Sequence, residues 1–336
     1  MLRIVTVTLN PAIDRTVWVD ALVPGTTVRT ADTLANFGGK GINVARGVAR
    51  IGGPVTALGL AGEDQATPID RYLESLGVPA HFIRTPGETR TNLKIIEQTN
   101  GRLTEINGSG AEVRREHVDA LERELLSVVD QDGVGVVVFA GSLPMGVDAS
   151  VYARWTELLR DRQPSLRVLV DASDEALEHA AQARPFFVKP NRVEAAALTG
   201  RRIETDADAA EAARQILALG VRGVLLSLGS AGAIAGWGNE VQRLPANAIA
   251  GPKGQLQTTV GAGDAMVARV AVELAKLNGA DVEQEAFFGM CQLAVAEAEA
   301  QIVGVVASPP RAQSPEYPGV VPADEERRGA VPMADV

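Results

Sequence analysis

Asp264 is the acid whose surroundings most suggest chemistry, because it separates three small residues from a long apolar-periodic stretch in TTVGAGDAMVARVAVELAKL (258–277). Gly261, Ala262 and Gly263 leave backbone N–H groups uncovered at a helix start, where such groups form a cradle for an anion. Asp264 would then handle a proton beside that anion. Glycine and aspartate are also common at helix starts, where the carboxylate caps the first turn. Taken alone, the stretch favours capping.

A second glycine-rich stretch is FGGKGINVARGVARIGG (37–53). Its glycines, Gly39 among them, allow backbone to approach a ligand closely at the start of a helix. Lys40 and Asn43 stand three residues apart and so share one face of that helix. A glycine-rich loop with a solvated lysine explains the pattern equally well. The spacing is not the GxxxxGK[ST] of a phosphate-binding P-loop.

Three further polar positions lie at or near predicted strands. Asp14 comes just past the first strand, where α/β proteins bind ligands, although an ordinary turn aspartate also fits. Arg90 and Asn92 in GETRTN are two residues apart and face the same side of a strand. An arginine offers a planar fork suited to phosphate or carboxylate, and the alternative is a solvent-facing side chain.

The stretch KPNRVE places Lys189, Asn191 and Glu194 directly after another predicted strand. The spacing of Asn191 and Glu194 is that of a capping box, which ties the side chain of each to the backbone near the other. Capping alone explains this spacing, and a ligand-binding role is compatible with it.

The elements that must position these residues alternate along most of the chain. The sequence predicts buried strands at 3–9, 55–60, 134–140, 166–172, 185–190 and 222–228, and helices at 42–51, 68–76, 116–129, 150–161 and 206–219. Several strands lack an inside–outside alternation, as is typical of parallel strands covered on both faces. The pattern predicts a mostly parallel sheet between helices, with ligands beyond the carboxyl ends of its strands.

Two segments, 16–36 and 89–107, break this alternation and are predicted to be strand pairs with interleaved polar and apolar residues. The second has Asn100-Gly101 at its centre, the strongest short-range signal for a hairpin. We expect both pairs to form a small β lid beside the strand ends. An edge extension of the main sheet is the alternative.

Composition narrows the classes of partner. The chain of 336 residues has 32 Lys and Arg against 42 Asp and Glu, a net charge of −10 that argues against a broad nucleic-acid interface. One cysteine excludes an intramolecular disulfide, and three histidines make a His-rich metal site an unpromising interpretation. No signal peptide or membrane span is evident, so a cytoplasmic location is expected. The segment 308–336 is rich in proline and is expected to be a flexible tail after a single domain, 1–307.

The order of these motifs resembles the PfkB/ribokinase family of sugar kinases over residues 1–305. GGKGINVAR and TVGAGD carry the resemblance most specifically. TLNPAIDRT, GETRTN, TEIN and GSLPMGV are similar to the branch that contains 1-phosphofructokinase and tagatose-6-phosphate kinase. The resemblance implies a ribokinase-like three-layer α/β/α domain with a small β-sheet lid, and use of ATP and Mg²⁺.

The resemblance also implies roles for individual residues. Asp264 would be the catalytic base, and Gly261, Ala262 and Gly263 the anion hole for the transferred phosphoryl group. The sugar phosphate would be bound by Asp14, Arg29, Gly39, Lys40, Asn43, Arg90 and Asn92, with Arg90 on the phosphate that the substrate already carries. The nucleotide phosphates and the magnesium would be bound near Lys189, Asn191 and Glu194, with Glu194 holding the metal through water. Ser227 and Gly229 would belong to the nucleotide-binding loop.

These roles define a reaction in which phosphoryl transfer depends on positioning and charge stabilisation. A helix N-terminus is expected to lower the pKa of Asp264 and keep it ionised. The implied substrate is a phosphorylated ketohexose: fructose 1-phosphate first, then tagatose 6-phosphate or fructose 6-phosphate. A kinase of an unphosphorylated sugar or nucleoside, and a catalytically silent sugar-phosphate sensor, stay open. A homodimer through the lid is compatible with an exposed β face.

Three positions depart from the family pattern. Arg269 replaces a small residue in the helix after Asp264, where a buried charge is costly unless it is paired. Thr27 stands where some relatives have a phosphate-binding lysine. Ala140 and Met145 replace common serine and proline. No proposed catalytic group is lost, but the substrate assignment is less specific.

Overall fold

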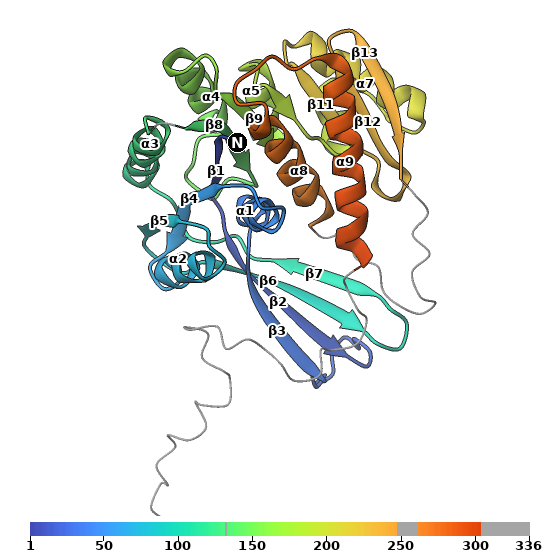
Figure 1. Ribbon diagram of the computed structural model, residues 1–336. Coiled ribbons are helices and arrows are strands. Elements are labelled where there is room, and N and C mark those ends of the chain that lie inside the picture. The colour runs from blue at the N-terminus through green and yellow to red at the C-terminus, as the bar shows by residue number, and fades with distance from the viewer. Residues whose placement is uncertain (132, 247–260, 304–336) are drawn as a thin grey trace, which may run out of the picture.

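The computed structural model describes residues 1–131, 133–246 and 261–303. The tail predicted at 308–336 lies outside the described residues. The described part folds into one large α/β layer structure with a smaller sheet projecting below it (Figure 1).

The main sheet has nine strands in the order β13-β12-β11-β10-β9-β8-β1-β4-β5. Neighbouring strands from β11 to β5 are parallel, and β12 and β13 add an antiparallel edge. The bounds are β1 Arg3–Thr8, β4 Val55–Gly62, β5 Ala80–Thr85, β8 Val134–Ala140, β9 Arg167–Asp171, β10 Phe187–Val188, β11 Gly223–Ser227, β12 Gly232–Trp237 and β13 Glu240–Pro245.

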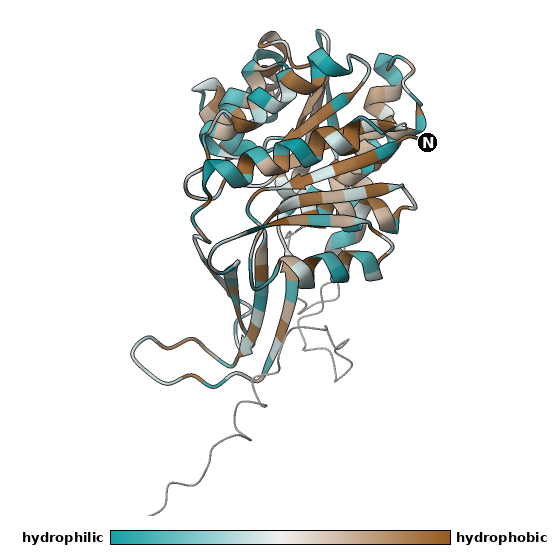
Figure 2. Ribbon diagram, turned by 90° about the vertical axis from the view of Figure 1, so that its left-hand side faces the viewer, coloured by the Kyte–Doolittle hydropathy of each residue, from teal (hydrophilic) through white to brown (hydrophobic). Residues whose placement is uncertain are grey.

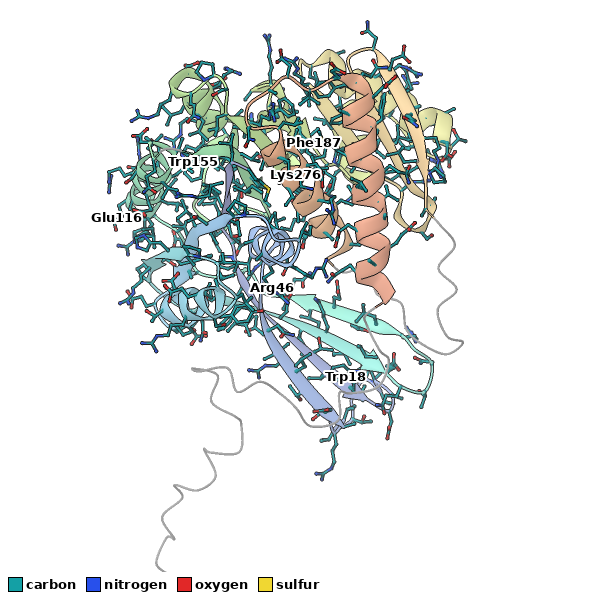
Figure 3. The ribbon with its side chains drawn as sticks, viewed as in Figure 1. Trp18, Arg46, Glu116, Trp155, Phe187 and Lys276 are labelled. Atoms are coloured by element: carbon teal, nitrogen blue, oxygen red, sulfur yellow. The ribbon has the colours of Figure 1, made fainter. Side chains whose placement is uncertain are left out.

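Helices cover both faces of this sheet and form two separate hydrophobic cores. One core joins the sheet to α1, α2, α8 and α9, and includes Phe187; the other joins it to α3–α7, and includes Trp155 (Figure 3). The central strands are the most apolar part of the molecule, while many outward-facing helix positions are hydrophilic (Figure 2). The bounds are α1 Lys40–Arg50, α2 Ala66–Ser75, α3 Arg115–Val129, α4 Val151–Arg162, α5 Asp174–Gln182, α6 Arg192–Thr199, α7 Asp206–Ala218, α8 Ala262–Lys276 and α9 Gln284–Val303.

The predicted lid is a separate four-stranded sheet in the order β3-β2-β6-β7, so the edge-extension alternative is wrong. Its strands are β2 Ala12–Val19, β3 Asp32–Gly38, β6 Arg90–Glu97 and β7 Leu103–Asn107. The hairpin between β6 and β7 turns at Gly101, whose φ of 69° suits glycine. Each predicted segment supplies one antiparallel pair, and a parallel pairing of β2 with β6 joins them.

The structure corrects several predicted elements. The strand predicted at 185–190 is reduced to the two residues of β10, and β5, β12, β13, α5 and α9 were not predicted. The helix after the glycine-rich stretch begins at Ala262, with Gly261 as its N-cap, rather than at Asp264. Among the described helices, none has the length and apolar character that a membrane span requires.

Candidate active site

A cavity of about 1150 Å³ lies between the carboxyl ends of the strands and the lid. Loops and helix starts converge there because parallel strands deliver their carboxyl ends to one edge of a sheet. Most of the predicted site residues line it: Asp14, Gly39, Lys40, Asn43, Arg90, Asn92, Lys189, Asn191, Ser227, Gly229, Gly261, Ala262, Gly263 and Asp264. Residues from the two ends of the sequence therefore meet in one cavity.

Asp264 is the third residue of α8, and its side chain is only 7% exposed. Among the described residues, no side chain caps the α8 N-terminus, so the expectation that Asp264 caps this helix is wrong. Its Oδ2 instead accepts a hydrogen bond of 2.9 Å from Nδ2 of Asn43 on α1. The carboxylate is thus held by another element and directed toward the cavity.

The pKa of Asp264 is raised to about 6 by burial and, next in size, by the nearby negative charge of Asp171. The Asn43 hydrogen bond and the positive charges of Lys40 and Lys189 lower it, but they do not outweigh burial. We expected the helix N-terminus to lower this pKa, and that expectation is wrong. A pKa of about 6 leaves Asp264 ionised at neutral pH and gives it more strength as a base than an ordinary aspartate.

Asp171 is a site residue that the motifs did not reveal. It is the last residue of β9, is completely buried, and pairs with two lysines: Lys40 Nζ at 3.0 Å and Lys189 Nζ at 3.3 Å from its Oδ1. Burial opposes ionisation, but the two lysines outweigh it and hold the pKa of Asp171 below its ordinary value. Its position at the carboxyl end of a predicted strand was the one available signal.

The capping box predicted from KPNRVE is present at the start of α6. Asn191 Oδ1 accepts the N–H groups of Val193 and Glu194, and Glu194 Oε2 accepts the N–H of Asn191 at 2.8 Å. The other oxygen of Glu194, Oε1, lies 3.9 Å from Lys40 Nζ. Glu194 therefore caps α6 and still turns one oxygen toward Lys40.

Asp14 on β2 is held by the lid and by close backbone approach. Asn92 Nδ2 donates to its Oδ1 at 2.9 Å, and Lys94 Nζ lies 3.5 Å from its Oδ2. A Cβ at Gly38 would lie 2.4 Å from Asp14 Oδ2, and one at Gly41 would lie 2.3 Å from Thr8 Oγ1. Gly38 therefore lets β3 lie close to the Asp14 carboxylate within the lid, and Gly41 lets α1 lie close to β1.

The two predicted phosphate-binding arginines lie in different environments. Arg90 begins β6, and its guanidinium donates to the carbonyl oxygens of Asn10 at 3.0 Å and Pro11 at 3.3 Å. Arg29 is exposed on the loop between β2 and β3 and does not line the cavity. The structure therefore brings Arg90 to the site but not Arg29.

Arg269, the main departure from the family pattern, is paired. Its guanidinium contacts Glu297 at 2.5 Å and Glu273 at 3.3 Å, and its side chain is 21% exposed. The unpaired buried charge that the sequence raised as a concern is absent at this position.

A parallel α/β sheet with a cavity beyond its strand ends, a β lid and a buried carboxylate in the first turn of a helix suit a small-molecule kinase. The comparison with family models agrees, because residues 7–306 match the model of the pfkB family of carbohydrate kinases. The chain belongs to that family and is a carbohydrate kinase.

The chain is also similar to individual phosphofructokinases. The chain is 38% identical to the 1-phosphofructokinase of Rhodobacter capsulatus over 268 residues, 80% of this chain and 82% of that protein. It is 36% identical to the 1-phosphofructokinase of Vibrio cholerae over 267 residues, 79% and 81% of the two chains. Among solved structures, phosphofructokinase-2 from Escherichia coli in complex with fructose-6-phosphate superposes with a TM-score of 0.79 at 28% identity, covering 91% of this chain and 95% of that one.

Proposed function

We propose that this carbohydrate kinase transfers a phosphoryl group from ATP to a hydroxyl of a phosphorylated ketohexose and gives a sugar bisphosphate. Fructose 1-phosphate is the first candidate, followed by tagatose 6-phosphate and fructose 6-phosphate. The observation that carries the proposal is that Arg90 lines the same cavity as Asp264. A lid cation in the same cavity as the proton acceptor suits a substrate that already carries a phosphate. Similarity to 1-phosphofructokinases supports the order of candidates.

Asp264 accepts the hydroxyl proton as the oxygen attacks the terminal phosphoryl group. The backbone N–H groups at Gly261–Gly263 stabilise the charge that develops on the transferred group, and they do so without reorganisation because the helix fixes them. Asn43 orients the carboxylate through its hydrogen bond to Oδ2. Lys40 and Lys189 are anchored on Asp171, which leaves their ammonium groups beside the same cavity for nucleotide phosphates.

The residues present also fit Mg²⁺, which takes oxygen ligands and usually keeps water and substrate phosphates around it. Glu194 offers one carboxylate oxygen, and Asp171 Oδ2 is buried and has no hydrogen-bond partner within the described part of the chain. No cluster of three or more His, Cys, Asp or Glu suited to a metal occurs among the described residues. Glu194, through water, and Asp171 would therefore hold the ion only together with the nucleotide phosphates, whose charge it would neutralise.

A coupled ADP-release assay over free and phosphorylated sugars and nucleosides tests the proposal, with wild type, Arg90→Ala and Arg90→Lys side by side. We expect turnover on fructose 1-phosphate. Arg90→Ala should weaken binding of the sugar phosphate by on the order of 2–4 kcal/mol and raise its KM accordingly, because a bidentate charge-assisted contact is lost. Arg90→Lys, in which that contact is only weakened, should raise the KM by less. The KM for ATP should be nearly unchanged.

Two outcomes would contradict the proposal, and a third would contradict the role of Arg90. Turnover on ribose or adenosine but on no sugar phosphate would favour the kinase of an unphosphorylated substrate. Binding of sugar phosphates without any ADP release would favour the silent sensor. An unchanged KM in Arg90→Ala would show that another group binds the phosphate.

A further inference from the structure

The inner face of the lid carries a second cation, Lys94, that none of the sequence motifs includes. Lys94 is on β6, four residues after Arg90 and two after Asn92, so all three face the same side. In the lid sheet, its neighbours on the adjacent strands are Thr16 of β2 and Glu105 of β7. Its side chain is only 17% exposed and lines the large cavity.

Lys94 and Asn92 hold the two oxygens of one carboxylate. Asn92 Nδ2 donates to Asp14 Oδ1 at 2.9 Å, and Lys94 Nζ pairs with Asp14 Oδ2 at 3.5 Å. Both partners come from β6, which runs parallel to β2 in register with Asp14. A carboxylate tethered at both oxygens cannot rotate freely about its Cβ–Cγ bond. Its remaining lone pairs therefore have defined directions.

Lys94 also balances charge in the cavity. Five cations line it, namely Lys40, Arg90, Lys94, Lys189 and Arg192, and five acids, namely Asp14, Glu105, Asp171, Asp264 and Glu299. The lid contributes Arg90 and Lys94 against Asp14 and Glu105. Without Lys94, Asp14 would lose its ion-pair partner and would repel an anionic sugar more strongly, with Arg90 as the remaining cation that interacts with it.

A smaller cavity of about 470 Å³ continues from this site between α1 and the lid. Asp14, Asn43, Lys94 and Gly261 line both cavities. Arg46 lies in this region between α1 and the lid, over the ring of Tyr72 (Figure 3). Lys94 thus lines both the large cavity and this smaller one.

We propose that Lys94 is a positioning residue that determines sugar specificity by fixing the carboxylate of Asp14. The proposal rests on the proposed function, with Asp14 accepting hydrogen bonds from the sugar hydroxyls as the family resemblance implies. A carboxylate with fixed lone pairs accepts hydrogen bonds from two neighbouring hydroxyls only in one relative orientation. Ketohexose phosphates whose hydroxyl orientation differs at one carbon should therefore bind with different affinity. Hydrogen-bonding sites discriminate more strongly than apolar pockets, because a mismatch leaves a polar group unpaired.

A double-mutant cycle tests this role, with Lys94→Met, Asp14→Asn and the double variant assayed on the sugar phosphate that wild type turns over. We expect Lys94→Met to raise the KM for the sugar by about 10- to 100-fold, with kcat and the KM for ATP within about threefold of wild type. The ratio of kcat/KM between the fructose and tagatose phosphates that carry the phosphate on the same carbon, which are epimers, should shrink. Lys94→Arg should restore most of the KM and of the ratio. In the Asp14→Asn background, Lys94→Met should raise the KM for the sugar by less than about threefold.

Lys276→Met is the matched control, since Lys276 is half exposed in the last turn of α8, away from the lid (Figure 3). It should leave every constant unchanged. Full additivity of the two single effects would overturn the proposal and make Lys94 a direct contact to the substrate. An unchanged KM or an unchanged epimer ratio in Lys94→Met would also overturn it. Failure of the proposed function shows itself separately, as wild-type turnover only on sugars without a phosphate.

Discussion

At the scale of single residues, the proposed chemistry depends on the environment of Asp264. Burial keeps its pKa high enough for a useful base, and Asn43 fixes the oxygen that would accept the proton. Replacement by asparagine retains size and a hydrogen-bond acceptor for Asn43 but removes the proton acceptor. We predict that Asp264→Asn lowers kcat by about 10²- to 10⁴-fold, with both substrates still binding within a few-fold of wild type.

The pH profile of the wild type belongs to the same prediction. A base must be ionised to accept a proton, so kcat/KM should fall as pH drops through about 6 and level off above it. Stopped-time ADP release at several pH values, with ligand affinities measured by titration, checks both expectations. Retention of most of the wild-type kcat by Asp264→Asn would contradict the catalytic assignment, and so would a profile flat down to pH 4.5.

At the scale of elements, the site depends on how closely α1 approaches β1. A Cβ at Gly41 would lie 2.3 Å from Thr8 Oγ1 and 2.9 Å from the carbonyl oxygen of Val7, and the latter is backbone that cannot move aside. We predict that Gly41→Ala displaces α1 and destabilises the protein by about 1–3 kcal/mol, as overpacking does. Because α1 carries Lys40 and Asn43, kcat should fall as well.

Gly289→Ala is the control for that change. Gly289 is exposed within α9, and a Cβ there meets nothing within 4 Å. Alanine should stabilise this helix by about 0.5–1 kcal/mol and leave activity unchanged. Urea unfolding curves and the coupled assay measure both variants. Equal stability of Gly41→Ala and wild type would show that α1 has room to shift.

Elements were predictable from sequence where local signals were strong. β8 has the bounds predicted from VGVVVFA, and α7 begins after the cap at Thr205. β12, GAIAGW, was not predicted, because its small residues are all buried and show neither alternation nor β-branched enrichment. The ion pairs of Asp171 with Lys40 and of Asp14 with Lys94 join residues 131 and 80 positions apart, so only the tertiary fold reveals them. The pKa of Asp264 was misjudged for the same reason: local sequence showed the helix start but not the burial or Asp171.

At the scale of the whole molecule, the candidate active site lies beyond the carboxyl ends of the nine-stranded sheet, and the buried carboxylate of Asp264 links its protonation to the stability of the fold. Asp264 has an ordinary pKa of 3.8 when exposed, and about 6 in the folded protein. A raised pKa means that the folded state binds the proton more tightly than the unfolded state. The favourable contribution of Asp264 to folding is therefore fully present below pH 3.8 and is lost as pH rises through about 6. At neutral pH the ionised carboxylate costs on the order of 1–3 kcal/mol.

This cost predicts that Asp264→Asn raises the stability of the protein at neutral and higher pH although it lowers the activity. Asparagine does not titrate, so Asp264→Asn should be more stable than wild type at pH 8 by on the order of 1–3 kcal/mol. The difference should shrink as pH falls through 6 and be close to zero near pH 4. Urea unfolding of both proteins at pH 4, 6 and 8 measures it, and Asp130→Asn, at an exposed carboxylate paired with Arg162, is the control that should give no such gain. Residues selected for catalysis commonly carry such a cost, because a site arranged for reaction is not arranged for maximal stability. A stability loss in Asp264→Asn that is the same at all three pH values would mean that the carboxylate serves the fold through its contacts rather than the reaction through its charge.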